Sequence, residues 1–233
     1  MSHLHIPDGL LPVWLWAAGL AAALIVVLLS LFMVRRMDLK KKIPMLGMMS
    51  AVMLVGMSIE VVPYHLNLSV ITGIVLGPWL ALVAAFIVNL LLSLVGHGGV
   101  TVVGLNTLVI GSEGVMGYVL FSAFRRVLSP GASAAAATFT ALFMSTCLML
   151  LIVFLGNVDL NLSQARELGE VMQSAPAEFV KRVFNMSGGF NLKFFALASF
   201  AMGAVGWTIE AFVTAVAVRF IDKVKPDMIG RRR

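Results

Sequence analysis

The chain has 233 residues, of which 60% are hydrophobic and only 12% are charged, about half the charged share of a typical soluble domain. A soluble domain of this length leaves much of its surface in water, so a mean hydropathy of +1.00 excludes a soluble enzyme. The net charge is +6, and the basic residues cluster at the ends of apolar runs. This placement indicates membrane topology rather than a binding face, so we expect no nucleic-acid partner. We predict an all-α, polytopic helical bundle that forms a single membrane domain over residues 1–233.

The first two apolar runs predict two membrane-spanning helices, over residues 11–34 and 43–62. A cluster of five basic residues between positions 35 and 42 separates the two runs. Basic loops of this kind face the cytoplasm, so residues 1–10 and the loop at Pro63 are expected outside the cell.

The third apolar stretch, residues 66–95, is interrupted by Gly77-Pro78 and fits either one long span or two short, broken spans. The later spans decide between these alternatives. They cover residues 105–124, 131–155 and 194–221, and basic residues follow the first and the last of them. This series is consistent only with two short spans, so we predict about seven transmembrane helices, with the N-terminus outside and the C-terminus in the cytoplasm.

One long loop, residues 156–193, joins the last two spans. Its apolar residues recur at roughly helical spacing, which indicates either an amphipathic helix on the outer interface or a solvated connector. We expect the loop on the outer side in both cases.

The four histidines, His3, His5, His65 and His97, all fall on the outer side of this topology. Histidine is the commonest neutral ligand for zinc, cobalt, nickel and copper, so four of them in a chain poor in polar groups indicate a metal site. A free amine at Met1, with the following amide nitrogens and the imidazole of His3, would wrap an ion in a plane, and nickel and copper favour that geometry. Residues 1–10 are therefore a candidate metal-binding segment.

Several polar residues near or inside the spans are candidates for supporting roles. Asn106 and Thr107 would hydrogen-bond to ligating imidazoles or, alternatively, join neighbouring helices. Glu60 lies near the outer end of its span and is a candidate to assist the metal. Glu113 and Glu210 lie in apolar runs, where we expect them to form hydrogen bonds between helices.

The segment from His5 to Pro12, HIPDGLLP, resembles the opening of the CbiM/NikM family, the cobalt and nickel substrate-capture components of energy-coupling-factor uptake transporters. The resemblance covers most of the chain and implies seven spans with the N-terminal segment tucked into the outer face. Its further matches, the last of them weak, are His65 twelve residues before Gly77-Pro78-Trp79, Gly96-His97-Gly98-Gly99 with Thr101, Gly104-Leu105-Asn106-Thr107, and Ile209-Glu210-Ala211 to Lys225-Pro226-Asp227.

The resemblance also implies a planar nitrogen site for Co²⁺ or Ni²⁺ as the transported substrate, with no permanently bound cofactor. Its ligands would be the N-terminal amine, an early histidine and a histidine before the third span. Carried over, these histidines are His5 and His65, supported by His97 and Asn106. Family members typically begin Met-His, whereas four residues precede His5 here, so His3 and His5 both stay candidates.

The family implies a location in the inner (plasma) membrane and three kinds of partner: a transmembrane coupling subunit, cytoplasmic ATPase subunits and often a small auxiliary membrane subunit. The chain contains no Walker phosphate-binding loop, so we expect ATP hydrolysis on a separate subunit. Two other interpretations stay open. One is a structural or sensory membrane subunit, and the other is an intramembrane enzyme using His97, Glu113 and Ser112, which lack a complete catalytic arrangement.

Overall fold

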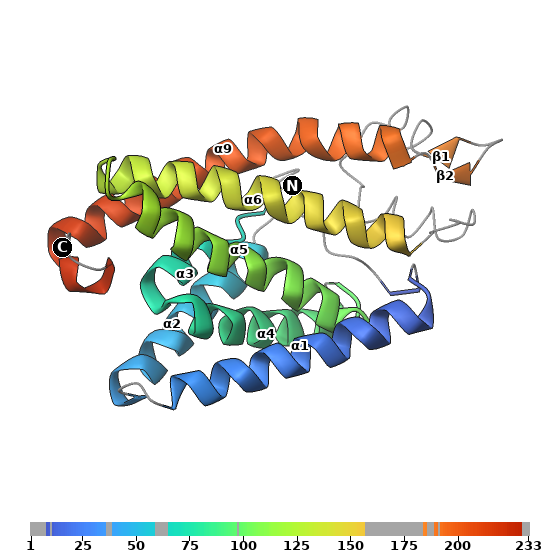
Figure 1. Cartoon of the computed structure of the whole chain (residues 1–233), viewed down its shortest axis with the longest axis horizontal. Coiled ribbons are helices and arrows are strands. Elements are labelled where there is room, and N and C mark those ends of the chain that lie inside the picture. Colours follow the sequence, from blue (N-terminus) through green and yellow to red (C-terminus); the bar gives the residue numbers. More distant parts are fainter. Residues whose placement is uncertain are drawn as a thin grey trace.

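The computed structural model describes eight segments of the chain: residues 8–9, 11–35, 39–58, 65–96, 98–156, 184–185, 189–190 and 192–229. Seven α-helices lie in these segments, which confirms the predicted all-helical bundle (Figure 1). The helices are α1 (Val13–Val34), α2 (Leu39–Ser58), α3 (Ser69–Leu76), α4 (Pro78–Leu94), α5 (Val103–Phe124), α6 (Pro130–Leu155) and α9 (Leu192–Val224). A short 3-10 helix, η1 (Pro226–Ile229), follows α9.

Four of these helices, α1, α5, α6 and α9, are long and apolar enough to cross a membrane. The apolar helices in α2 and α4 are shorter. Large apolar side chains lie exposed on the helices, such as Leu28 on α1 and Phe212 on α9, which are 65% and 70% exposed. Lipid tails are the natural solvent for such surfaces, so these exposed apolar side chains form the lipid-facing surface of the bundle.

The predicted break in the third apolar stretch is confirmed at Gly77-Pro78, which separates α3 from α4. Gly77 has a φ of 85°, a conformation that glycine adopts without steric cost, and Pro78 is the first residue of α4. The two helices differ greatly in length. Helix α3 has eight residues, so it rises about 12 Å and covers less than half of a hydrocarbon core about 30 Å thick.

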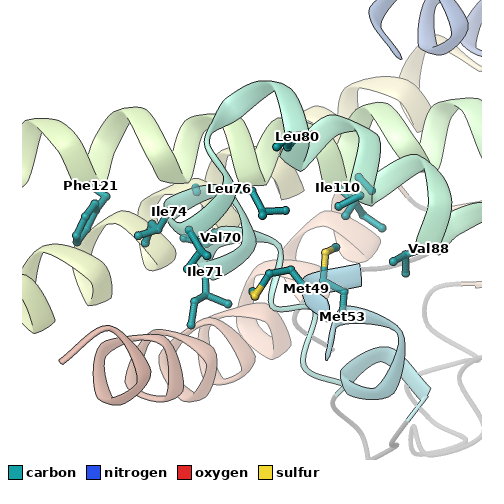
Figure 2. Close-up of a cluster of buried hydrophobic side chains, with 14 of the residues drawn as sticks. Met49, Met53, Val70, Ile71, Ile74, Leu76, Leu80, Val88, Ile110 and Phe121 are labelled. Atoms are coloured by element: carbon teal, nitrogen blue, oxygen red, sulfur yellow. The ribbon is translucent and has the colours of Figure 1, made fainter. Parts of the chain in front are cut away.

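The bundle surrounds α3 on all sides. All eight residues of α3 are buried. Its side chains pack with Met49 and Met53 of α2, with residues of α4, and with Ile110 and Phe121 of α5 (Figure 2). A helix this short makes few hydrogen bonds of its own, so its position depends on the elements that enclose it.

Helix α5 contacts α1, α3, α4 and α6 and is the centre of the bundle. Two of its crossings rely on glycine. A side chain at Gly104 would collide with the backbone of α1 at Leu20, and a side chain at Gly73 of α3 would collide with the backbone at Gly114 of α5. Close approach of this kind replaces the hydrophobic driving force that helices lack in lipid.

The bundle has two distinct ends (Figure 1). The α1–α2 and α5–α6 connections and the C-terminal end of α9 lie at one end, where Arg125 forms an ion pair of 2.8 Å with Asp222. The start of α1, the α4–α5 connection, the end of α6 and the start of α9 lie at the other end. Most of the predicted outer loop, residues 157–183, lies outside the described residues, and so does its amphipathic helix. The described part of the loop includes an antiparallel pair, β1 (Phe184–Asn185) with β2 (Gly189–Phe190).

The crossing of α3 and α5 should tolerate no Cβ atom. Replacing Gly73 with Ala places that atom against the backbone of Gly114, which cannot rotate away as a flexible side chain could. We expect a loss of about 1–3 kcal/mol of stability, measured as a lower melting temperature of the purified protein at a fixed heating rate. The matched control is Gly47→Ala in α2, where a Cβ meets nothing within 4 Å. Equal melting temperatures for the two variants would contradict the described crossing.

Candidate metal site

His65 belongs to a short loop, residues 65–68, that leads directly into α3. Two consecutive main-chain amides of this loop donate to the carboxylate of Glu210 on α9. The Asn67 amide lies 3.2 Å from Oε2, and the Leu68 amide lies 3.0 Å from Oε1. Leu68 has a φ of 58°, which is uncommon for a residue with a side chain. Glu210 therefore holds the loop by its backbone, in a conformation that the loop would not adopt readily alone.

Glu113 on α5 holds the same region through side chains. Its Oε2 accepts hydrogen bonds from the Asn67 side-chain amide and from the Ser69 hydroxyl, the latter at 2.6 Å. Its Oε1 accepts from the Ser145 hydroxyl of α6 at 2.6 Å. Glu113 and Glu210 are both fully buried. The expected hydrogen bonds between helices are confirmed for Glu113, which binds Ser69 of α3 and Ser145 of α6. Glu210 instead binds the backbone of the loop that carries His65.

The depth of this loop differs from the sequence-based expectation, which placed it at the outer end of the bundle. Glu113 lies in the middle of α5, a helix of 22 residues, so it is about 15 Å along the axis from either end. Asn67 and Ser69 hydrogen-bond to it and lie at the same depth. The prediction was wrong here because α3, with eight residues, is too short to carry the chain across the bundle.

The second fixed point is Asp8, which anchors the N-terminal segment to the α4–α5 connection. Its carboxylate accepts hydrogen bonds from the Val100 amide at 2.9 Å and from the Thr101 amide at 2.8 Å. The Thr101 hydroxyl donates to it as well. A side chain at Gly99 would collide with Asp8, so this glycine makes room for the anchor. Gly98 and Thr101 belong to the His97 motif, and Asp8 belongs to the HIPDG motif, so the two motifs meet here.

Asp8 is ionised at neutral pH. Partial burial acts to raise its pKa, but hydrogen bonds from the Thr101 hydroxyl and from the amides of Thr101, Val100 and Val102 together lower the pKa of Asp8 below its ordinary value of 3.8. A lowered pKa in the folded state means that the anchor contributes its full stability above the ordinary value. That contribution is lost only as the pH falls through the lower folded value, so the anchor persists across the physiological range.

The structure describes three of the predicted site residues. His65 is half-buried, and its Nδ1 atom is buried. Asn106 and Thr107 are buried in the first turns of α5. The Thr107 hydroxyl has no hydrogen-bond partner among the described residues, and a buried polar atom of this kind is a candidate to meet a group outside them.

The other predicted site residues, Met1, His3, His5, Glu60 and His97, lie outside the described residues. Within the described segments, no group of three or more His, Cys, Asp or Glu side chains is arranged to hold a metal ion. The ligand set therefore stays a prediction. The alternative nucleophile Ser112 donates to the Val109 carbonyl of its own helix at 2.6 Å, while Glu113 accepts from Asn67, Ser69 and Ser145.

These features define a multi-pass membrane protein in which Asp8, close to the N-terminus, is bound to the α4–α5 connection. The family model described as "Cobalt uptake substrate-specific transmembrane region" matches residues 5–228, nearly the whole chain. The chain therefore belongs to this family, CbiM, and is a transmembrane component of cobalt uptake. No curated protein matches the chain in sequence.

Two solved structures are similar to this chain. One, titled "Crystal Structure of an transition metal transporter", is 22% identical with a TM-score of 0.75, and the alignment covers 95% of this chain and 93% of that one. The other, titled "Crystal Structure of an Truncated Transition metal Transporter", is 20% identical with a TM-score of 0.74, covering 94% and 99%. At these identities the likeness establishes the shared fold.

The Asp8 anchor predicts slow hydrogen exchange at two specific amides. Replacing Asp8 with Asn removes the negative charge from the acceptors of both amides and turns one of the two acceptor atoms into a donor. A hydrogen bond to a charged group is worth about 1.5–3 kcal/mol, so exchange at Val100 and Thr101 should accelerate by about 10-fold or more at neutral pH. Exchange followed by mass spectrometry measures this. Asp227→Asn, in η1 at the opposite end of the bundle, should leave these amides unchanged. Protection that survives Asp8→Asn would show that the anchor is not what holds the loop.

Proposed function

We propose that this protein captures Co²⁺ or Ni²⁺ from outside the cell and is the substrate-binding membrane component of an ATP-driven uptake transporter. The observation that carries the proposal is the pair of fixed points on either side of the outer half of α5. Asp8 is held at Thr101, two residues before α5 begins, and the loop of His65 is held at Glu113 in the middle of α5.

The distance between the fixed points suits a site shared by the N-terminal segment and His65. Glu113 is ten residues beyond the start of α5, so the two points are separated by about 15 Å along the helix. Seven residues precede Asp8, and a fully extended chain of that length reaches about 25 Å. The N-terminal residues can therefore reach the depth of His65 without releasing the anchor.

The proposed ligands are nitrogen atoms. His65 supplies an imidazole nitrogen. The N-terminal segment supplies further nitrogen atoms, from the imidazoles of His3 and His5 and from the amine of Met1. His97, Glu60 and the buried polar pair Asn106 and Thr107 would support the site through hydrogen bonds. Nitrogen donors in a plane favour Ni²⁺ over harder ions, and Co²⁺ follows it closely in affinity.

The proposed orientation places the anchored N-terminal segment outside. Basic residues gather at the end of the bundle that carries the α1–α2 and α5–α6 connections and the end of α9, and they include Arg35, Lys40, Lys42, Arg125, Arg126, Lys223 and Lys225. Positive charge marks the cytoplasmic side of membrane proteins. Asp8 and the α4–α5 connection lie at the opposite end, which is then open to the external metal (Figure 1).

The proposed partners include the subunits that supply the energy for uptake by ATP hydrolysis. The sequence lacks a Walker phosphate-binding loop, so ATP hydrolysis falls to cytoplasmic ATPase subunits, linked to this chain by a transmembrane coupling subunit. A small auxiliary membrane subunit would complete the transporter. Family membership supports this assembly because the family is described as substrate-specific, which implies other subunits with other tasks.

Metal binding to the purified protein tests the proposal. We expect calorimetric titration with Ni²⁺ and Co²⁺ to show one ion per chain, with affinity that falls at low pH because the nitrogen ligands must lose protons. His65→Ala and a version with extra residues before Met1 should each bind far more weakly. Thr208→Ala, whose hydroxyl donates to the Ala204 carbonyl of its own helix at 2.7 Å, should bind normally.

Each other result has a distinct meaning. Wild-type protein that binds neither ion at neutral pH would contradict the proposal. Equal binding by the N-terminally extended version would remove the amine from the ligand set and leave a site made of side chains alone. Normal metal uptake after replacement of both His5 and His65 would favour a structural or sensory subunit.

A further inference from the structure

We propose that Glu113 and Glu210 are positioning residues for metal capture, which hold the 65–68 loop so that His65 stays at a fixed depth and orientation in the bundle. The inference rests on the proposed function, since it assigns His65 to the metal. It gives a task to two intramembrane carboxylates that neither the family description nor the ligand prediction includes.

The first argument is the pattern of contacts. Glu210 accepts from the backbone amides of Asn67 and Leu68, and Glu113 accepts from the Asn67 side chain and from Ser69. Every one of these donors lies within four residues of His65 in the chain. The Ser145 hydroxyl of α6 donates to Glu113 as well and ties that carboxylate to a further helix. The two acidic side chains are therefore directed at one short loop.

The second argument is the cost of burying carboxylates. A charged or polar group at membrane depth is expensive and is kept only where a task requires it. Helix packing alone needs no carboxylate here, because apolar residues of similar volume often stabilise a bundle as well or better. Glu210 accepts hydrogen bonds from two backbone amides, and Glu113 accepts them from side chains of the same segment. Apolar residues cannot accept such bonds, which fix the path of an irregular segment.

The third argument is the conformation of the loop itself. Leu68 lies in the left-handed region of backbone space, and residues 65–67 before it form no helix or strand. The Leu68 amide and the Asn67 amide together bind opposite oxygens of one carboxylate. Loss of either bond frees the loop to adopt a commoner conformation, and His65, the first residue of the loop, would move with it.

The test compares variants that change these contacts without changing the size of the side chains. Glu210→Gln keeps the shape but replaces one acceptor with a donor. Ser145→Ala removes one of the hydrogen bonds that orient Glu113, without substituting either carboxylate or any residue of the loop. Ser133→Ala is the matched control, because Ser133 is also buried on α6 but donates to the Ser129 carbonyl at 2.9 Å.

Two readouts are taken on the full-length protein: the dissociation constant for Ni²⁺ by calorimetry, and the visible absorption spectrum of the Ni²⁺-loaded protein. Residues behind the ligands typically change metal affinity about 10–100-fold. We expect a loss of that size with a shifted spectrum for Glu210→Gln, and a smaller loss of about threefold to tenfold for Ser145→Ala. Ser133→Ala should match wild type in both readouts.

The outcomes separate the two proposals. Variants that unfold at a lower temperature but bind Ni²⁺ with wild-type affinity and spectrum would overturn the positioning role and leave the proposed function intact. If Glu210→Gln does not fold, wild-type affinity and spectrum in Ser145→Ala would overturn it in the same way. Wild-type protein that binds no metal contradicts the proposed function itself, and the inference falls with it.

Discussion

The structure depends on the hydrogen bonds that two buried carboxylates accept from the loop before α3. Helix α3 is too short to cross the bilayer, so the chain must place irregular backbone at membrane depth. Such backbone persists only where protein satisfies its polar groups. Glu210 satisfies two main-chain amides, and Glu113 gathers Asn67, Ser69 and Ser145. Helices α3, α5, α6 and α9 are thereby joined at one point in the middle of the bundle.

A second anchor, at Asp8, adds the other boundary of the proposed site. The two anchors differ in chemistry as their surroundings demand. Asp8 lies near the bundle surface, and its lowered pKa keeps it charged at physiological pH. The inner pair is enclosed by side chains and meets neutral donors. Between the anchors runs the N-terminal half of α5, which carries the buried residues Asn106 and Thr107. A metal ion held between the N-terminal segment and His65 would lie beside this stretch.

The apolar runs and the Gly-Pro break between two of them predicted the helices well, because lipid imposes a length and an apolar composition on each span. The break at Gly77-Pro78 and the seven helices are examples. The depth of the His65 loop was not predictable in this way. It follows from pairs 46 and 143 residues apart, Asn67 with Glu113 and with Glu210, and no local pattern encodes such a pairing. The contact between Asp8 and Thr101, 93 residues apart, was not predicted for the same reason, although both motifs that contain these residues were recognised.

X-ray absorption at the nickel edge of the loaded protein tests the central claim most directly, because it identifies the atoms bound to the ion. The account predicts a first shell of nitrogen atoms, with the outer-shell scattering that imidazole rings produce, and loss of part of that scattering in His65→Ala. A first shell made mainly of oxygen would contradict it. The ion would then be held by carboxylates or carbonyls, and His65 would have to be held in place for a different purpose.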